Sequence, residues 1–262
     1  MKKFKKLILL ACVAITLPML QACDDDKGYP VDALAADWAT IRTTGSAFYL
    51  DSDEWGTCWP VNLNLGHYKA VDGKRALLFF SPIYDNFEGY DHAVKIIEIN
   101  DALTKSAEKL TEENTDTLGN DGVYIFKGDM SVSNGYLNII FQQNLPKSPD
   151  TKHRISLVAD PAYFTDNKEG RETDAENPGV DADGYVHVEL RYNSYGDTSG
   201  YYRPALVSFN LSPLNFPADS KGLKIKLNSE VNGPIEVTFD SHTNIAANRN
   251  TTNMDFSKMQ LE

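Results

Sequence analysis

The second half of this chain is a series of short segments in which every other residue is apolar, and this alternation limits what it can fold into. The pattern is clearest in residues 185–192, where Val186, Val188 and Leu190 alternate with polar side chains. The same period of two recurs in residues 136–142, 153–160, 205–211, 223–227 and 235–239. A period of two places the apolar side chains on one face of a strand. Such strands, separated by turn residues, predict a β-sandwich over residues 122–240.

The first half of the chain is also rich in strand-forming segments. They occupy residues 38–43, 47–50, 57–63, 75–83 and 93–99. Residues 76–80, Ala-Leu-Leu-Phe-Phe, are continuously apolar, which is typical of a strand buried on both faces. We therefore predict a separate β domain over residues 37–101.

Two stretches lack strand periodicity. Residues 101–110 have the composition of a short helix, and residues 111–120 are polar and lead into a Gly-Asn-Asp-Gly cluster. We predict that residues 102–121 are a linker between domains. Residues 241–262 are polar without sustained periodicity, which predicts a loose C-terminal tail.

The N-terminus has the parts of a secretory signal peptide. Lysines within the first six residues precede an apolar run from residue 7 to residue 20, which is too short for a spanning helix. The run ends in Leu20-Gln21-Ala22-Cys23, which resembles the bacterial lipobox, whose cysteine receives diacylglycerol. We predict that residues 1–22 are removed, that Cys23 is lipidated, and that residues 23–36 form a tether.

The residues directly after Cys23 predict the location of the protein in the cell. Three aspartates follow Cys23 directly, and this resembles the surface-export signal of lipoproteins in one lineage of Gram-negative anaerobes. Two or more acyl chains are sufficient for stable anchoring. We therefore expect an outer-membrane lipoprotein of the cell envelope that is exposed at the cell surface.

The charge of the chain excludes some classes of partner. The formal net charge is −12, and the signal peptide removes four lysines, so the mature chain is near −16. Nucleic-acid binding depends on Lys and Arg contacts to phosphate, so nucleic acid is not an expected partner. Acidity also opposes binding to anionic lipid surfaces. The membrane is expected as a partner only through lipid on Cys23.

Cysteine usage shows that the fold must be stable without disulfides. Cys23 and Cys58 are the cysteines that remain after processing, and lipid occupies the sulfur of Cys23. Cys58 stands between Trp55 and Trp59, and free cysteine is among the most buried residue types. We expect Cys58 to lie in a core.

The sequence contains no arrangement typical of catalysis or of a cofactor site. A Gly-x-Ser-x-Gly elbow, a His-Glu-x-x-His motif and a Walker loop are all missing, and the five histidines are scattered. Asp181-Ala-Asp183-Gly184 begins like a calcium loop, but Leu190 would stand at the position of the required Glu. We interpret it as a turn. We expect no metal, no cofactor and no enzymatic activity, although two carboxylates in a cleft would suffice for a glycosidase.

Residues 192–203 are the candidate binding segment. They predict a glycine-rich hairpin that carries Tyr192, Tyr195, Tyr201 and Tyr202. Tyrosine offers a large, stiff surface with a polar end, which suits both sugar stacking and protein interfaces. These four tyrosines are candidate ligand-binding or partner-binding residues. The alternative is that their rings cap the edge of the sandwich. Separately, Asp116-Thr117-Leu118 resembles an acceptor for envelope O-glycosylation at Thr117.

Several segments resemble NigD-like lipoproteins, in the same order along the chain. In the first half these are the opening Cys-Asp-Asp-Asp-Lys-Gly-Tyr and residues 46–53 and 94–100; in the second half they are residues 135–141, 152–158, 188–197 and 207–211. The resemblance implies an all-β protein with a small OB-like β-barrel followed by an immunoglobulin-like β-sandwich. It also implies a bacteriocin-associated or immunity-type role, for a family without established catalytic residues.

These observations favour a non-catalytic, lipid-anchored protein of the cell envelope that acts as an interaction module. Its expected partner is an unknown envelope or secreted protein, in an immunity-type or adhesion-type role. The alternative is a surface lipoprotein that binds glycan through the tyrosine segment. An enzyme is the third and least favoured hypothesis.

Replacement of Cys23 by Ala is expected to release the protein from membranes, because the sulfur that carries the lipid is lost. Fractionation of cells that express the Cys23→Ala chain measures this. A Cys58→Ala chain is the matched control and should stay with the membrane fraction. Sedimentation of both variants with membranes would contradict the predicted anchor.

Overall fold

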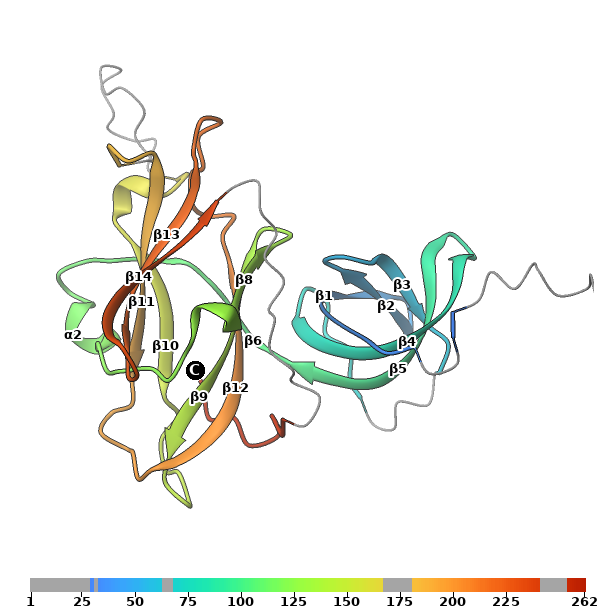
Figure 1. Ribbon diagram of the computed structural model, residues 1–262, viewed down its shortest axis with the longest axis horizontal. Coiled ribbons are helices and arrows are strands. Elements are labelled where there is room, and N and C mark those ends of the chain that lie inside the picture. The colour runs from blue at the N-terminus through green and yellow to red at the C-terminus, as the bar shows by residue number, and fades with distance from the viewer. Residues whose placement is uncertain (1–28, 31–32, 63–67, 167–180, 241–253) are drawn as a thin grey trace, which may run out of the picture.

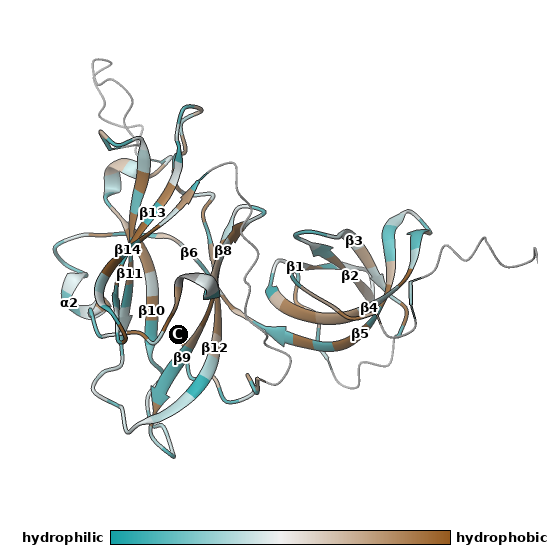
Figure 2. Cartoon of the chain, in the orientation of Figure 1, coloured by the Kyte–Doolittle hydropathy of each residue, from teal (hydrophilic) through white to brown (hydrophobic). Residues whose placement is uncertain are grey.

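The structure is a computed structural model that describes residues 29–30, 33–62, 68–166, 181–240 and 254–262. Nearly all of the regular structure in these residues is β, arranged as two domains (Figure 1). Figure 2 shows that hydrophobic residues concentrate along the strands of both domains. This confirms the all-β prediction.

The N-terminal domain is a closed barrel in the strand order β1-β2-β3-β5-β4. Its strands are β1 (Ala35–Thr44), β2 (Ala47–Ser52), β3 (Gly56–Pro60), β4 (Arg75–Phe87) and β5 (Tyr90–Asp101). Strand β4 pairs antiparallel with both β1 and β5, while β3 and β5 run parallel. The closed barrel confirms the predicted small N-terminal β-barrel.

Strand β4 is buried on both faces, as its apolar run predicts. Ala76, Leu78 and Phe80 point into the barrel core. Leu77 and Phe79 point outward, yet they are only 4% and 3% exposed. They belong to a second buried cluster with Trp38, Ala102, Ile140, Leu206 and Phe256. Since Ile140 and Leu206 belong to the second domain, the outer face of β4 forms the domain junction.

The C-terminal domain is a sandwich of a five-stranded sheet in the order β14-β13-β11-β10-β7 and a four-stranded sheet in the order β6-β12-β9-β8. Its strands are β6 (Leu103–Ser106), β7 (Glu108–Lys109), β8 (Met130–Ser133), β9 (Tyr136–Leu145), β10 (Arg154–Ala159), β11 (Tyr185–Asn193), β12 (Tyr201–Asn210), β13 (Gly222–Ser229) and β14 (Gly233–Asp240). Its helices are α2 (Thr115–Leu118), η2 (Lys127–Asp129) and η3 (Pro161–Tyr163).

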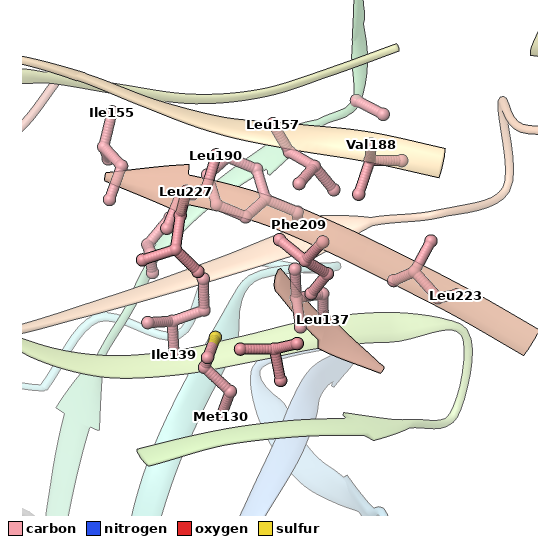
Figure 3. Close-up of a cluster of buried hydrophobic side chains, with 14 of the residues drawn as sticks. Met130, Leu137, Ile139, Ile155, Leu157, Val188, Leu190, Phe209, Leu223 and Leu227 are labelled. Carbon is pink, nitrogen blue, oxygen red and sulfur yellow. The ribbon is translucent and has the colours of Figure 1, made fainter. Parts of the chain in front are cut away.

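The two sheets pack through the apolar faces that the period of two predicts. Leu137 and Ile139 of β9 face Leu157, Val188 and Leu190 of the other sheet (Figure 3). Both sheets are mixed, because β11 pairs parallel with β13, β7 with β10, and β6 with β12. The parallel pairs arise where strands that are distant in sequence meet.

The predicted linker is wrong for residues 103–109. In place of a helix and a linker, β6 pairs parallel with β12 and β7 pairs parallel with β10. The chain therefore enters the sandwich directly after β5 and contributes one short strand to each sheet. Thr117 lies further along, exposed on α2 beside the fully buried Leu118.

The predicted loose tail is wrong for residues 254–262. Phe256 is 5% exposed and packs in the junction cluster. The Gln143 side chain bonds the Gln260 backbone twice, donating to its carbonyl at 2.8 Å and accepting from its N–H at 3.0 Å. Leu261 forms a parallel bridge with His153. Residues 254–262 therefore fasten the chain end to both the junction and the sandwich, whereas residues 241–253 lie outside the described part.

Cys58 lies in the barrel core, as expected, and is 1% exposed. Burial raises the pKa of its thiol to about 12, so it stays protonated and unreactive at neutral pH. Residues 1–22 and Cys23 lie outside the described residues. Among the helices of the described residues, none has the length and hydropathy to cross a membrane.

A buried arginine connects the two domains. Arg75 at the start of β4 forms a bidentate pair with Asp53, at 2.7 and 2.5 Å, and the two side chains are 0% and 1% exposed. The guanidinium also donates to Thr40 at 3.1 Å, to Asn138 at 3.1 Å and to Ser208 at 3.4 Å. All five guanidinium N–H groups thus have acceptors. Asn138 and Ser208 belong to the sandwich, so Arg75 holds both domains at once.

The carboxylate of Asp53 is held from the sandwich side as well. Ser133 donates to it at 2.5 Å, and Asn138 donates to Ser133 at 3.0 Å. The Arg75 guanidinium lies 4.5 Å from the ring centroid of Tyr136, a cation–π distance. A buried ion pair is tolerated only when its remaining groups are bonded, and this junction meets that requirement.

Replacement of Arg75 by Ala is expected to lower the free energy of unfolding by about 3–5 kcal/mol, because it leaves the Asp53 carboxylate buried without a cation. Urea unfolding followed by circular dichroism measures this. Arg42→Ala is the matched control. Its pair with Asp51 spans 3.5 Å with side chains 41% and 34% exposed, and an exposed pair contributes at most about 1 kcal/mol. Equal losses in the two variants would contradict the role of the junction.

Candidate functional site

The predicted tyrosine hairpin is not a hairpin. Strand β11 pairs with β10 and β13, whereas β12 pairs with β9 and β6, so the two strands belong to different sheets. Residues 194–200 therefore cross from one sheet of the sandwich to the other. The prediction fails because turn residues between two strands do not reveal which sheet each strand joins.

Tyr192 is not a surface residue, and its assignment as a binding residue is wrong. It is 4% exposed and packs in the sandwich core, with its ring edge-to-face to Phe141 at 6.1 Å. Burial raises the pKa of its hydroxyl above the usual range. The sequence contained the signal for this, because Tyr192 continues the alternation of Val186, Val188 and Leu190.

His153 satisfies the buried hydroxyl of Tyr192. It is fully buried, its Nδ1 bonds the Tyr192 hydroxyl, and its Nε2 lies 3.0 Å from the carbonyl of Asp197. Since a carbonyl only accepts, Nε2 carries the proton and Nδ1 accepts from Tyr192. Burial lowers the pKa of this imidazole. The backbone of His153 also bonds Gln260 and Glu262, at 2.9 Å each. His153 thus connects residues 194–200, through Asp197, to the last residues of the chain.

The other three candidate tyrosines are exposed. Tyr195, Tyr201 and Tyr202 are 48%, 52% and 43% accessible. The loop before β12 is held by Asn144, whose side chain accepts from the N–H groups of Ser199 at 3.2 Å and Gly200 at 2.6 Å. These rings are available to a partner, which is what a binding role requires.

Tyr202 belongs to a group of rings that the sequence reading missed. Tyr124 contacts Tyr202 at 5.3 Å and Phe126 at 5.5 Å between ring centroids. Phe126 is 40% exposed. We call Tyr124, Phe126 and Tyr202 the aromatic patch. Val123 and Ile125 are buried, so the four-residue run Val-Tyr-Ile-Phe alternates between core and surface. Because all four residues are apolar or aromatic, no polar residue marks the alternation in the sequence.

The patch lies on the outer face of the four-stranded sheet. Tyr202 stands opposite Asn144 of β9, and Tyr124 bridges to Gln142 two residues earlier. Tyr202 donates its hydroxyl to Glu230 at 2.5 Å, and this bond raises the pKa of the tyrosine. The Tyr124 ring contacts the rings of Phe126 and Tyr202, and the bond to Glu230 fixes the orientation of Tyr202. Such a surface offers a partner an apolar centre, formed by the rings, with the polar Glu230 at its edge.

A polar cluster occupies the other sheet, around the segment interpreted as a turn. Gly184 donates its N–H to the Asp181 carbonyl at 2.8 Å and has φ +87°, which confirms that turn. Asp183 bonds Lys224 and lies 3.1 Å from His187, and the Lys224 bond lowers the pKa of Asp183. These side chains neutralise one another. Among the described residues, no group of three or more His, Cys, Asp or Glu could hold a metal ion.

A cavity of about 480 Å³ opens at one end of the sandwich. Its walls are mainly apolar and include Leu211, Leu214, Phe216, Leu223 and Phe239. Asp240 is the one acidic residue in its lining, and it accepts from the Tyr185 hydroxyl at 2.8 Å. A glycosidase requires two facing carboxylates. The lining of this cavity therefore does not fit the glycosidase hypothesis.

The geometry defines a two-domain β protein with a barrel, a sandwich and an exposed aromatic surface. The profile of the NigD-like N-terminal OB domain matches residues 38–101, and that of the NigD-like C-terminal beta sandwich domain matches residues 106–241. The second match alone spans more than half of the chain. The protein belongs to the NigD-like family, which confirms the resemblance found in the sequence.

Solved structures share the fold. A protein of unknown function from Bacteroides vulgatus ATCC 8482 matches with a TM-score of 0.67 and 24% identity, covering 87% of this chain and 100% of its own. A protein named as toxin-related, from Parabacteroides distasonis ATCC 8503, matches with a TM-score of 0.58 and 28% sequence identity. The match covers 80% of this chain and 95% of that protein. A NigD-like immunity protein from Bacteroides caccae ATCC 43185 matches with a TM-score of 0.50 and 19% sequence identity. The match covers 80% of this chain and 93% of that protein. No curated protein matches the chain.

Acid is expected to destabilise the fold through His153. Its pKa is lowered in the folded state, so the unfolded chain binds a proton that the folded chain resists. Stability is therefore full above the unfolded pKa of about 6.5 and falls as the pH drops below it, by at most about 1.4 kcal/mol per pH unit for one proton.

Urea midpoints at pH 7.5 and 5.5 test this for the wild-type chain and for His153→Gln, whose amide can still accept and donate. The wild-type chain should lose more stability than the variant between these two pH values. Identical losses would show that His153 does not titrate in this range.

Proposed function

We propose that this protein is a non-catalytic, lipid-anchored protein of the outer membrane that binds a secreted or envelope protein in an immunity-type role. Membership in the NigD-like family supports this proposal, as do the fold relatives named as an immunity protein and as toxin-related. Lipid on Cys23 and the tether of residues 23–36 would present both domains at the cell surface.

The aromatic patch is the observation that carries the proposal. Phe126 and Tyr202 expose 40% and 43% of their surface, and both rings contact Tyr124. Exposed rings that cluster beside polar residues are typical of protein interaction sites, and this supports contact with a partner. Tyrosine is enriched among the residues that dominate the binding energy of protein interfaces.

The charge of the chain indicates the chemistry of that partner. The formal net charge of −12 favours association with a cationic protein. Glu230, which accepts from the Tyr202 hydroxyl, places a carboxylate at the edge of the patch. The partner would therefore present apolar or aromatic side chains flanked by Lys or Arg. Its association rate should fall as salt concentration rises, because the attraction between opposite charges is screened.

Replacement of Tyr202 or Phe126 by Ala is expected to weaken partner binding by about 2 kcal/mol, or about thirtyfold, since each removes an aromatic anchor. In-cell crosslinking of the tagged, lipidated chain, followed by mass spectrometry, identifies the partner. Recovery of that partner by each variant then measures the loss.

Tyr84→Ala provides the matched control, because Tyr84 is 56% exposed on the barrel and lies outside the patch. This variant should recover the partner like the wild-type chain. If the Tyr202 and Phe126 variants also recover it at wild-type level, the patch is not the interface. A deletion strain with unchanged sensitivity to antagonistic secreted proteins would count against the immunity-type role.

A further inference from the structure

A second group of aromatic rings lies on the outside of the barrel. Tyr90 contacts Trp59 at 4.9 Å and Tyr49 at 5.3 Å between ring centroids. The three rings come from β5, β3 and β2. Each is partly exposed, and none belongs to the buried hydrophobic clusters found among the described residues. We call Tyr49, Trp59 and Tyr90 the barrel platform.

The alternation of the strands places two of these rings outside. In β2, Phe48 and Leu50 point into the core, so Tyr49 between them points away. In β3, Cys58 points into the core, so Trp59 points outward. The fold therefore sets these rings side by side on one surface without using them for its own core.

A contact between β3 and the start of β5 lies next to the third ring. Asp91, next to Tyr90, accepts from the backbone N–H and the hydroxyl of Thr57, at 2.7 Å each. Gly56 has φ +66°, and a Cβ there would lie 2.6 Å from the Asp91 carboxylate. The positive φ favours glycine at this position, and the missing Cβ leaves room for the Asp91 carboxylate. The contact ties the start of β5 to β3 and so keeps Tyr90 against Trp59.

Polar side chains that suit hydroxyl groups flank the platform. Arg42 stands opposite Tyr49 in the sheet and pairs with Asp51 at 3.5 Å. Thr57 stands opposite Asp51, and Asp91 bonds Thr57. Guanidinium donors and carboxylate acceptors thus lie beside the rings, with the Arg42 and Asp51 side chains 41% and 34% exposed.

We propose that the barrel platform binds a neutral oligosaccharide. Aromatic faces accept the C–H faces of sugar rings, while paired donors and acceptors match neighbouring sugar hydroxyls. In OB barrels, the face of the second and third strands and the loop between the fourth and fifth bind oligonucleotides or oligosaccharides. The platform rings come from those strands and from the start of β5. The net charge of −12 opposes the oligonucleotide.

The platform is separate from the aromatic patch. Tyr49, Trp59 and Tyr90 belong to the barrel, whereas the patch belongs to the sandwich, and the tip of the β4–β5 hairpin rises from the barrel on the side away from the sandwich (Figure 1). One chain could therefore hold a sugar and a protein partner at once. Sugar binding does not rest on the proposed immunity-type role.

The test uses the full chain in detergent and a panel of neutral oligosaccharides, namely linear glucans, mannans, xylans and N-acetylglucosamine oligomers. Titration calorimetry should detect at least one that binds the wild-type chain. Trp59→Ala and Tyr90→Ala should each weaken that binding about tenfold or more. Tyr202→Ala should bind sugar like the wild-type chain, and Trp59→Ala should still capture the protein partner.

Unfolding midpoints of the variants separate loss of the site from loss of the fold. No binding by any panel member, or wild-type binding by both Trp59→Ala and Tyr90→Ala, overturns the proposal. Loss of the protein partner in Trp59→Ala, with no sugar bound by the wild-type chain, also overturns it and makes the platform a protein interface. If Tyr202→Ala recovers the protein partner at wild-type level, the aromatic patch is not the interface, but the proposed sugar site is unaffected. Tyr202 belongs to the sandwich, whereas the platform residues belong to the barrel.

Discussion

The arrangement of the domains depends on the hydrogen bonds that the buried Arg75–Asp53 pair of the barrel makes to the sandwich. Neither side chain reaches water, so each requires the other, and the remaining N–H groups of Arg75 need acceptors. Those acceptors come from both domains: Thr40 in the barrel, and Asn138 and Ser208 in the sandwich. Any movement of the sandwich against the barrel would break the hydrogen bonds of Asn138 and Ser208 to Arg75 and of Ser133 to Asp53. Apolar packing against β4 adds to this, but it has less directional specificity than the guanidinium.

A fixed junction gives the two aromatic surfaces a defined relation. The barrel platform and the aromatic patch are on separate domains, and neither contributes to a core. The last residues of the chain strengthen the junction, because Phe256 packs against the barrel side while Leu261 pairs with His153 of the sandwich. The protein thus combines two exposed aromatic surfaces with a packed junction between its domains.

The sequence predicts the strands of this protein better than their partners. The period of two around Val188 and the apolar run at residues 76–80 identified strands and burial correctly, because both are local properties of a strand. Strands β6 and β7 could not be predicted, because they are too short to show a period of two. They are stabilised by pairing with β12 and β10, which are far away in sequence. Tyr192 was misjudged because glycine and tyrosine content outweighed its place in the alternation. The aromatic patch and the barrel platform unite residues from separate strands, which only the fold brings together.

Calorimetry of the wild-type chain tests the central claim most directly. If the Arg75 junction makes the barrel and the sandwich one unit, heating should give a single transition whose calorimetric and van't Hoff enthalpies agree. Two separate transitions, or a calorimetric enthalpy well above the van't Hoff value, would show that the domains unfold independently. That result would contradict the claim that the bonds of the buried Arg75–Asp53 pair to the sandwich lock the two domains together.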